Sequence, residues 1–293
     1  MTPSPTHPAP LSPLTARKTW RTVEPFHGMI YFAPEAGESY ERLDLRPESG
    51  YFASRSAPMG AVGAETVIAT FYNFSPDLVR NAMSGVWATA RPEAVLEARL
   101  EAADESLRRM LGDAVHSAEL RRAGGLARSA AERAAERSAG RPLFAGHAGL
   151  DWPAAAHLVL WHAQTLLREF RGDGHITALV LHGLDPVEAL VMHAASGEVA
   201  TGFLRATRGW PDAEWDAGVE RLRRRGWLEP ADGDGPAPAL SPSGAAVRQA
   251  IEDATDQLAV HPYEAIGEEG CAELRALARP FSRAIVDASG FGA

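Results

Sequence analysis

The densest group of residues that could do chemistry lies in the segment 161–175, where histidine, arginine and glutamate interrupt an otherwise apolar run. His162, Thr165 and Glu169 follow one another at intervals of three and four residues, so a helix places them on one stripe. Burying these residue types together costs free energy unless they satisfy one another or hold a ligand. The segment therefore predicts either a ligand site or a buried ion-pair network, with Arg168 and Glu169 as its first members.

A second histidine, His27, stands in a similar aromatic and apolar run at 24–32. A histidine paired with a carboxylate is a general means of acid–base chemistry near neutral pH. We therefore predict His27, His162 and Glu169 as catalytic candidates. The candidates for ligand binding are the neighbouring cationic and aromatic residues Arg168, Arg171, His175, Tyr31 and Trp161.

The same residues are the donors for any cofactor. Two histidines, His27 and His162, with Glu169 or His175 could bind a metal ion, and one histidine beside aromatic side chains could ligate a haem. No HExxH, P-loop, GxGxxG or GxSxG motif accompanies them, and the single cysteine, Cys271, excludes an internal disulfide and a cysteine metal cluster. The cofactor and the reaction therefore stay undefined, and the metal ion and the haem are hypotheses only.

The elements most typical of a known fold lie at 211–258. A predicted helix at 211–225 ends at Gly226, which lets the chain leave the helix in a left-handed conformation. An acidic, glycine-rich loop at 232–236 and a second helix at 245–258 follow. This order is typical of the end of a winged helix, so we expect short β-strands on both sides of the loop.

The first half carries a fainter copy of this order. Residues 74–87 and 210–227 share an aromatic residue, Pro-Asp and a glycine ahead of tryptophan, and His27 and His162 open stretches of similar length. The shared order favours an internal duplication, and the alternative is two helical subdomains with chance similarities. We predict a mainly α fold with short β-wings, whose tandem winged-helix-like repeats form a pseudo-twofold unit and bring both histidines toward one cavity.

This interpretation divides the chain into a disordered tail at 1–14, a first repeat at 15–112, a linker or helical connector at 113–150, and a second repeat with C-terminal helices at 151–293. Within these parts we expect a helix at 15–33 interrupted by Pro25, and another at 92–111. A further helix is expected to start near Pro153 and to stop at the Arg-Gly-Asp-Gly sequence 171–174. Residues 113–141, almost without large apolar side chains, are expected to be solvated.

Charge and composition restrict the partners. Acidic residues outnumber basic ones by 38 to 29, and the predicted reading helix of the winged helix begins with Asp212, Glu214 and Asp216, which repel phosphate. DNA is therefore the less favoured partner. No apolar run is long enough to span a bilayer, and the first residues lack the pattern of a signal peptide. We expect a cytoplasmic protein without a membrane partner.

The stretches 24–32, 161–175 and 206–210 resemble the SalK-like helix-turn-helix proteins of actinobacteria, over about residues 15–285. The resemblance implies a helix-turn-helix fold and an occurrence in or near secondary-metabolite gene clusters; it supplies no catalytic residues.

Three functions follow from these observations. The first is a small-molecule-binding protein, and in its sharper form a secondary-metabolism enzyme, with a polar His/Arg/Glu pocket at the junction of the repeats. The second is a winged-helix DNA-binding transcriptional regulator that senses a ligand in that pocket, and the third is a protein-interaction module without a ligand. We favour the first because the polar residues gather before the wing while the reading helix is acidic. Enzymatic activity and oligomeric state stay open.

Overall fold

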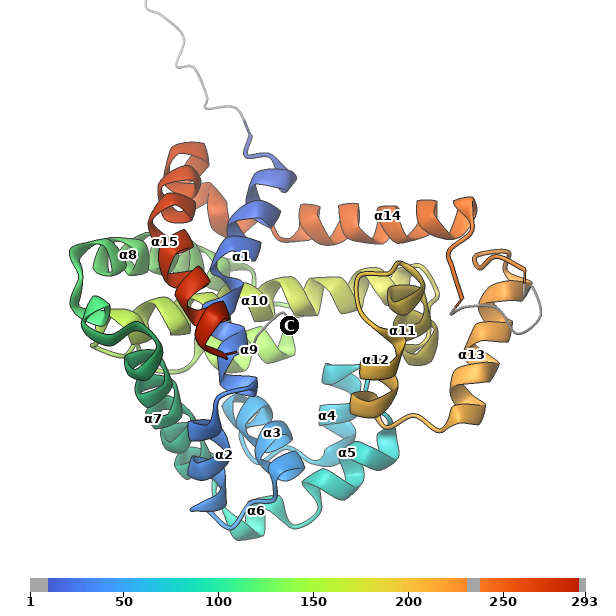
Figure 1. Ribbon diagram of the computed structural model, residues 1–293, viewed down its shortest axis with the longest axis horizontal. Helices are drawn as coiled ribbons and strands as arrows, with labels where there is room; N and C mark the ends of the chain where they lie inside the picture. Colours follow the sequence, from blue (N-terminus) through green and yellow to red (C-terminus); the bar gives the residue numbers. More distant parts are fainter. Residues whose placement is uncertain (1–9, 231–237, 290–293) are drawn as a thin grey trace, which may run out of the picture.

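The computed structural model describes residues 10–230 and 238–289, and its longest described helix, α10 (Ala156–Leu181), runs through the middle of the molecule (Figure 1). Helices α1 (Pro13–Gly28), α8 (Ala118–Ala134) and α14 (Pro242–Leu258) pack against it. Because neighbours surround it, α10 is buried on most sides and lacks a single apolar stripe. Its polar side chains are therefore forced into contact with other elements.

The rest of the first half lies below α10 in Figure 1 and contains several short helices and one helix of 20 residues. They are α2 (Pro34–Glu41), α3 (Pro47–Ser56), α4 (Ala64–Phe71), α5 (Pro76–Met83), α6 (Val86–Thr89) and α7 (Pro92–Leu111), with 3-10 turns η1 (Met29–Tyr31) and η2 (Ala57–Met59). Proline occupies the first turn of α2, α3, α5 and α7, where its missing N–H has no helical partner to lose. The helix predicted at 92–111 is confirmed by α7.

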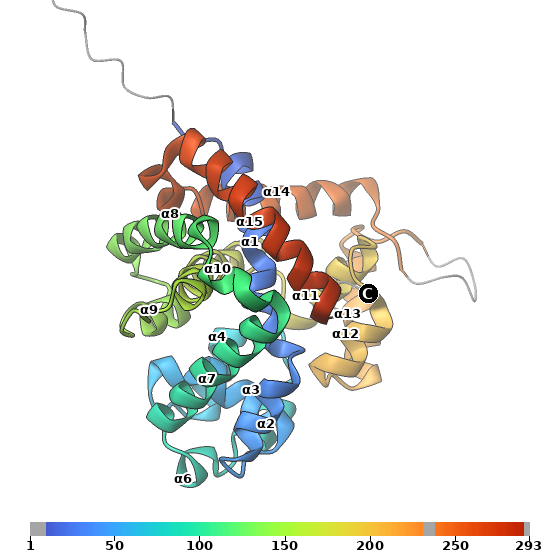
Figure 2. The ribbon, with the colours of Figure 1, turned by 60° about the vertical axis from the view of Figure 1, so that its left-hand side comes forward.

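The middle of the chain and its second half supply the remaining elements. They are α9 (Pro142–Ala148), α11 (Pro186–Ala195), α12 (Thr201–Arg208), α13 (Asp212–Arg224) and α15 (Gly267–Ser289), with the 3-10 turns η3 (Gly112–His116), η4 (Ala135–Arg137) and η5 (His261–Ala265). In the turned view α15 lies along α1 (Figure 2), and the two helices are in contact. The N-terminal and C-terminal helices are thus packed together beside α10.

Two groups of buried apolar side chains form the core. The larger group joins the first half with α8, α9, the first part of α10 and α15, and includes Phe26, Leu107 and Phe170. The smaller group joins the end of α10 with α11–α14 and includes Trp215 and Ile251. Helix α10 therefore belongs to both groups and holds α11–α14 to the rest of the protein.

The mainly helical fold is confirmed, but the β-wings are not. In the part of the chain that the structure describes there is no strand, only an isolated antiparallel bridge between Leu228 and Leu240. The loop predicted at 232–236 lies outside the described residues. Gly226 does adopt the left-handed conformation, with φ of 70°. The tandem winged-helix-like repeat stays a prediction.

Two predicted helix interruptions are wrong. Helix α1 passes through Pro25 and ends at Gly28. Helix α10 continues through 171–174 to Leu181, although each glycine costs about 1 kcal/mol of helix propensity. The glycine at 174 serves close packing: a Cβ there would lie 2.9 Å from the guanidinium of Arg141. Tertiary contacts with α9 and α14 therefore outweigh the local stop signal.

The segment predicted to be solvated, 113–141, is only partly so: its turns and one face of α8 are exposed, whereas the other face of α8 is buried. Side chains on the buried face, among them Leu120, Ala123 and Ala127, are inaccessible, and α8 packs against α10. A Cβ on Gly124 would lie 3.3 Å from the carbonyl oxygen of Ala156, so the small residues allow a close helix–helix approach. The chain divisions at 112 and 150 stay predictions, and α1 begins at Pro13, two residues before the predicted start of structure.

No single described helix is long and apolar enough to cross a membrane; α10 and α11 meet the length and composition limits only as a pair bent by 101°.

Candidate functional site

Ionisable side chains from four separate parts of the chain meet where α1, η1, α3, α10 and the end of α12 come together. We call this group the junction cluster. Its members are Glu24, His27, Tyr31, Tyr51, Arg55, Arg168, Glu169 and Arg208.

Glu169 is the anionic centre of the junction cluster. Arg168 donates to both of its carboxylate oxygens at 2.9 and 3.0 Å, and Arg55 approaches Oε1 at 3.6 Å. Burial alone would raise the pKa of Glu169, but Arg168, Arg55 and Arg99 outweigh it and hold the pKa below its usual range. Glu169 is therefore an ionised carboxylate shared by two guanidinium groups.

His27 links two hydroxyl groups inside the cluster. Its Nδ1 lies 3.0 Å from Oγ1 of Thr165, and its Nε2 lies 2.8 Å from the phenol oxygen of Tyr31. Because the Thr165 hydroxyl donates to the carbonyl of Trp161, it accepts from Nδ1–H, so Nε2 accepts the proton of Tyr31. Burial, reinforced by Arg168 and Arg99, lowers the pKa of His27 well below its usual value, and the ring is neutral.

A second carboxyl, Glu24, lies beside Arg168. The two side chains are 3.7 Å apart, and the amide of Gln164 donates to Glu24 at 3.1 Å. Burial raises the pKa of Glu24 to about 7, even though Arg168 and Gln164 oppose the rise. This carboxyl is therefore only partly ionised at neutral pH.

The end of α12 closes the cluster against the loop between α4 and α5. Arg208 lies with its guanidinium carbon 4.7 Å from the ring centroid of Phe74, and its carbonyl accepts from the N–H of Ser75 at 2.9 Å. In the same loop Tyr72 has φ of 63° and donates its hydroxyl to the carbonyl of Leu184. A positive φ is strained for an aromatic residue and is held only by surrounding contacts, so the loop is fixed by its contact with the second half.

Polar atoms of this region are incompletely satisfied. Among the described residues, Nε of Arg55, Nε of Arg208, and Nε and Nη2 of Arg99 are buried without a hydrogen-bond partner. Arg99 makes one hydrogen bond, to the carbonyl of Ser54 at 2.9 Å, and lies 5.5 Å from the ring of Trp161. Buried donors of this kind are rare, and each calls for an explanation.

His162 does not join His27, contrary to the predicted facing arrangement. The ring of His162 packs edge-on against Trp152 at 4.8 Å, and its Nε2 has no hydrogen-bond partner among the described residues. Burial lowers the pKa of His162 to about 4, with Arg99 and Arg128 adding to the effect. The stripe containing His162, Thr165 and Glu169 therefore divides: Thr165 and Glu169 face the cluster, while His162 packs in an aromatic contact.

Arg171 and His175 also lie apart from the cluster, next to α14. Arg171 contacts Asp256 at 2.7 Å and Glu252 at 3.4 Å, and Arg17 contacts the same two carboxylates at 3.4 and 3.1 Å. We call these residues the α14 ion-pair network. His175 lies beside the network, with Nδ1 3.0 Å from the hydroxyl of Thr255, and burial lowers its pKa to about 4.

A metal centre receives no support from the geometry. The described residues contain no group of three or more histidine, cysteine, aspartate or glutamate side chains arranged to hold a metal ion. His27 uses both ring nitrogens for hydrogen bonds to hydroxyl groups.

Sequence reasoning missed several members of the site. Arg55, Arg99 and Tyr51 were not predicted, and Glu24 and Arg208 lie in the stretches 24–32 and 206–210 that carry the family resemblance without having been assigned to the site. The one available signal is at Arg55, an isolated arginine that follows Tyr51-Phe52-Ala53-Ser54 and is 7% exposed. Arg99 and Arg208 lie in segments whose charge pattern resembles any helix surface, so only the tertiary structure brings them inward.

The predicted reading helix, α13, presents paired charges. Arg221 contacts Asp185 at 2.7 Å, Arg223 contacts Glu220 at 2.7 Å, and Arg225, directly after the helix, contacts Glu188 at 3.2 Å. Its acidic start is covered in part by Arg205, which contacts Asp212 and Asp216. These guanidinium groups are thus neutralised within the protein, which weakens any phosphate contact through this helix.

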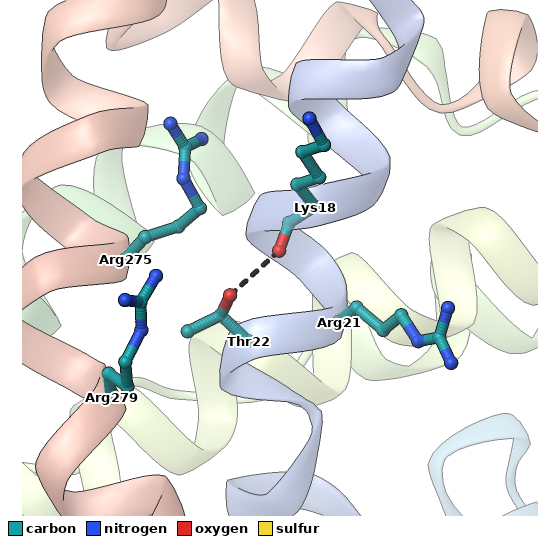
Figure 3. A pocket seen from close by; sticks show the side chains of 5 residues that line it. All are labelled: Lys18, Arg21, Thr22, Arg275 and Arg279. Carbon is teal, nitrogen blue, oxygen red and sulfur yellow. Dashed lines mark hydrogen bonds between the residues drawn. The ribbon is translucent and has the colours of Figure 1, made fainter.

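Unpaired basic side chains gather instead between α1 and α15. An open hollow of about 380 Å³ is lined by Lys18, Arg21, Thr22, Arg275 and Arg279 (Figure 3). None of the four basic residues has a salt bridge in the described part of the chain. Figure 3 shows the guanidinium groups of Arg275 and Arg279 on one helix and the ammonium group of Lys18 on the other.

Comparison with known proteins gives one match. Neither a curated protein nor a solved structure matches the chain. A family model described as a helix-turn-helix family matches residues 16–292, a span that contains the junction cluster, the α14 ion-pair network and α13. The chain therefore belongs to this helix-turn-helix family.

Proposed function

We propose that the protein binds a small molecule at the junction cluster, between α1, α3, α10 and the end of α12. The observation that carries the proposal is that Arg168 is surrounded by polar groups and is still partly accessible. It interacts with Glu24, Tyr31 and Tyr51 from three surrounding elements, yet 28% of its side-chain surface is accessible. A half-buried arginine side chain that is surrounded by polar groups with fixed orientations is where a small ligand can make polar contacts.

The chemistry of the cluster supports the same proposal. A packed structural core has little use for several ionisable groups with unused donors, because each one costs free energy. Strain and unsatisfied groups are typical of sites that have been shaped for binding. The strained Tyr72 and the unpartnered Nε atoms of Arg55 and Arg208 lie in or beside this cluster.

As an enzyme, the protein would use the hydrogen-bonded pair of His27 and Tyr31 for acid–base chemistry at this site. Neutral His27 accepts a hydrogen bond from the hydroxyl of Tyr31 and is held in its tautomer by Thr165. We therefore assign His27 and Tyr31 as the acid–base pair and Glu169 as the carboxylate that positions Arg168 and Arg55. If the protein is a secondary-metabolism enzyme, as the resemblance to SalK-like proteins predicts, His27 and Tyr31 would supply its acid–base chemistry.

Native mass spectrometry and an absorption spectrum of the purified protein test the proposal. We expect an additional mass or absorbance, retained in the wild type and reduced in Tyr31→Phe and Arg168→Gln. The Tyr31→Phe substitution keeps the ring packing and removes only the hydroxyl, so the fold is preserved. Arg122→Gln, which removes an exposed pair with Glu273, is the matched control and should retain the ligand. Equal retention in all variants would place the ligand elsewhere.

A DNA-binding regulator is the second candidate, favoured by the helix-turn-helix family and by the basic hollow between α1 and α15. Because Arg221 and Arg223 of α13 are paired with carboxylates, phosphate contacts would come mainly from Lys18, Arg21, Arg275 and Arg279. Arg224 is the arginine of α13 that has no salt bridge among the described residues. This candidate predicts binding to duplex DNA that weakens steeply with salt. Lys18→Gln with Arg279→Gln should weaken it, whereas Arg223→Gln should not; absence of salt-dependent binding at low ionic strength would rule the candidate out.

A further inference from the structure

The junction cluster carries more positive than negative charge. Arg55, Arg168 and Arg208 belong to it, and the positive charge of the buried Arg99 interacts electrostatically with Glu169. In the part of the chain that the structure describes, the carboxylates that contact these arginines are Glu169 and Glu24. Since Glu24 is only partly ionised at neutral pH, the junction cluster holds an excess of guanidinium charge.

Arg208 shows the excess most directly. Its side chain donates to the hydroxyl of Thr207 at 2.8 Å and lies over the face of Phe74, and none of the described carboxylates forms a salt bridge with it. Burial lowers the pKa of Arg208, and Arg55 and Arg168 lower it further by repulsion. An arginine stays protonated in spite of such shifts, so its charge needs an external partner.

Arg55 has the same need. Its guanidinium carbon lies 4.3 Å from the ring centroid of Phe71, and it is 7% exposed. One nitrogen donates to the hydroxyl of Tyr51 at 2.9 Å, and another is 3.6 Å from Glu169, beyond good hydrogen-bond distance. The aromatic faces stabilise these cations in part, but they provide no acceptor for the remaining N–H groups.

From this imbalance, and resting on the proposed function, we infer that the ligand of the junction cluster carries an oxyanion, a carboxylate or a phosphate, which binds between Arg55, Arg168 and Arg208. A planar guanidinium presents paired N–H donors that match the geometry of both groups. The phenol oxygen of Tyr51 accepts from Arg55 at 2.9 Å, and the ring centroid of Tyr31 lies 5.8 Å from the guanidinium carbon of Arg55, so both tyrosines are close enough to contribute to the site.

Titration calorimetry at constant ionic strength tests the inference, with sodium phosphate, sodium acetate and sodium benzoate as probes and sodium chloride as the reference. We expect saturable binding of at least one oxyanion and none of chloride. Phosphate binding without carboxylate binding, or the reverse, identifies the class of oxyanion. Loss of a charge-assisted hydrogen bond should weaken binding by about tenfold or more in Arg208→Gln, while Arg122→Gln should bind as the wild type does.

Thermal unfolding gives a second measurement, in which Arg208→Gln is not expected to be harmful: the substitution weakens oxyanion binding but should not lower the unfolding temperature. Without an oxyanion, Arg208→Gln should unfold at the same temperature as the wild type or at a higher one, because it removes an uncompensated charge. With the oxyanion, only the wild type and Arg122→Gln should gain stability. A lower unfolding temperature of oxyanion-free Arg208→Gln, or equal oxyanion binding in this variant, would overturn the inference.

The two proposals fail separately. If native mass spectrometry finds a neutral molecule at the cluster, the small-molecule site stands and the oxyanion inference is wrong. If no molecule is retained and none of the three oxyanions binds, both are wrong.

Discussion

Helix α10 carries two arginines three residues apart, the half-buried Arg168 and the buried Arg171, and their surroundings differ in charge balance. Arg171 lies in the α14 ion-pair network, where two arginines meet two carboxylates, Glu252 and Asp256. Arg168 lies in the junction cluster, where arginines exceed ionised carboxylates. The same residue type on one helix therefore serves two purposes.

The difference shows how to separate a structural ion pair from a binding site. A balanced network satisfies its own donors, so it fixes α14 against α10 and α1 and leaves nothing for a ligand. An unbalanced cluster leaves donors unused and stores a cost that binding of an anion relieves. In this protein the charge balance, and not the presence of buried arginine, distinguishes the two.

The largest expected effect is at Arg171. Arg171→Gln leaves Asp256, 7% exposed at its side chain, and Glu252 with Arg17 as their remaining cation. Breaking a buried pair costs about 3–5 kcal/mol of unfolding free energy, measured by urea denaturation. Arg17→Gln, at a more exposed arginine, should cost less. A loss at Arg171 no larger than that of Arg208→Gln would remove the distinction between the two regions.

Glu24 gives an effect of intermediate size that depends on pH. Burial raises its pKa from 4.5 to about 7, so between these values the folded chain holds a proton that the unfolded chain releases. The stability contributed by this group is therefore present below about pH 4.5 and is lost as pH rises to about 7. Glu24→Gln removes the loss, and the variant should gain roughly 3 kcal/mol over the wild type across this window.

The measurement for Glu24 is a pair of urea unfolding series at pH 4.5 and 7.5. Comparing the two proteins at each pH cancels the contributions of the buried histidines, which are common to both. Parallel pH profiles would mean that Glu24 is ionised throughout and balances the junction cluster as Asp256 balances its network.

The smallest expected effect is at His162. His162→Phe keeps the contact with Trp152 and removes the unpartnered Nε2, so unfolding free energy at pH 7 should change by less than about 1.5 kcal/mol. Ligand retention should be unchanged in His162→Phe. His27→Phe breaks the hydrogen bonds of His27 with Thr165 and Tyr31, so ligand retention should be reduced in that variant. If His162→Phe reduced retention more than His27→Phe, His162 would belong to the site after all.

Part of the site could be predicted from local pattern. Arg168 and Glu169 are conspicuous because they stand in an apolar segment, and the structure pairs them. His27 and Tyr31 share one face at a spacing of four residues, and they are hydrogen-bonded. The partners from α3 and α12 could not be found in this way, because Arg55 and Arg208 lie 113 and 40 residues from Arg168 in the chain and no local pattern connects them.

Local pattern also failed where packing opposed it. Gly172 and Gly174 predict the end of a helix, but α10 continues through both residues because it packs against α9 and α14. The alanines of α8 read as solvated, yet their small size is what allows the close approach to α10. In both cases side chains far away in sequence decide the outcome, which propensity and periodicity do not record.

The sequence by itself determined the mainly helical fold, the helix at 92–111, the left-handed Gly226 and the pairing of Arg168 with Glu169, since each depends on residues close together in the chain. The tertiary structure decided which arginines are balanced. Charge balance is a sum over contacts in space, and for Arg168 and Arg171 those contacts come from different helices: α1, η1 and α3 for the first, α1 and α14 for the second. That sum separates the proposed binding site from the ion-pair network beside it.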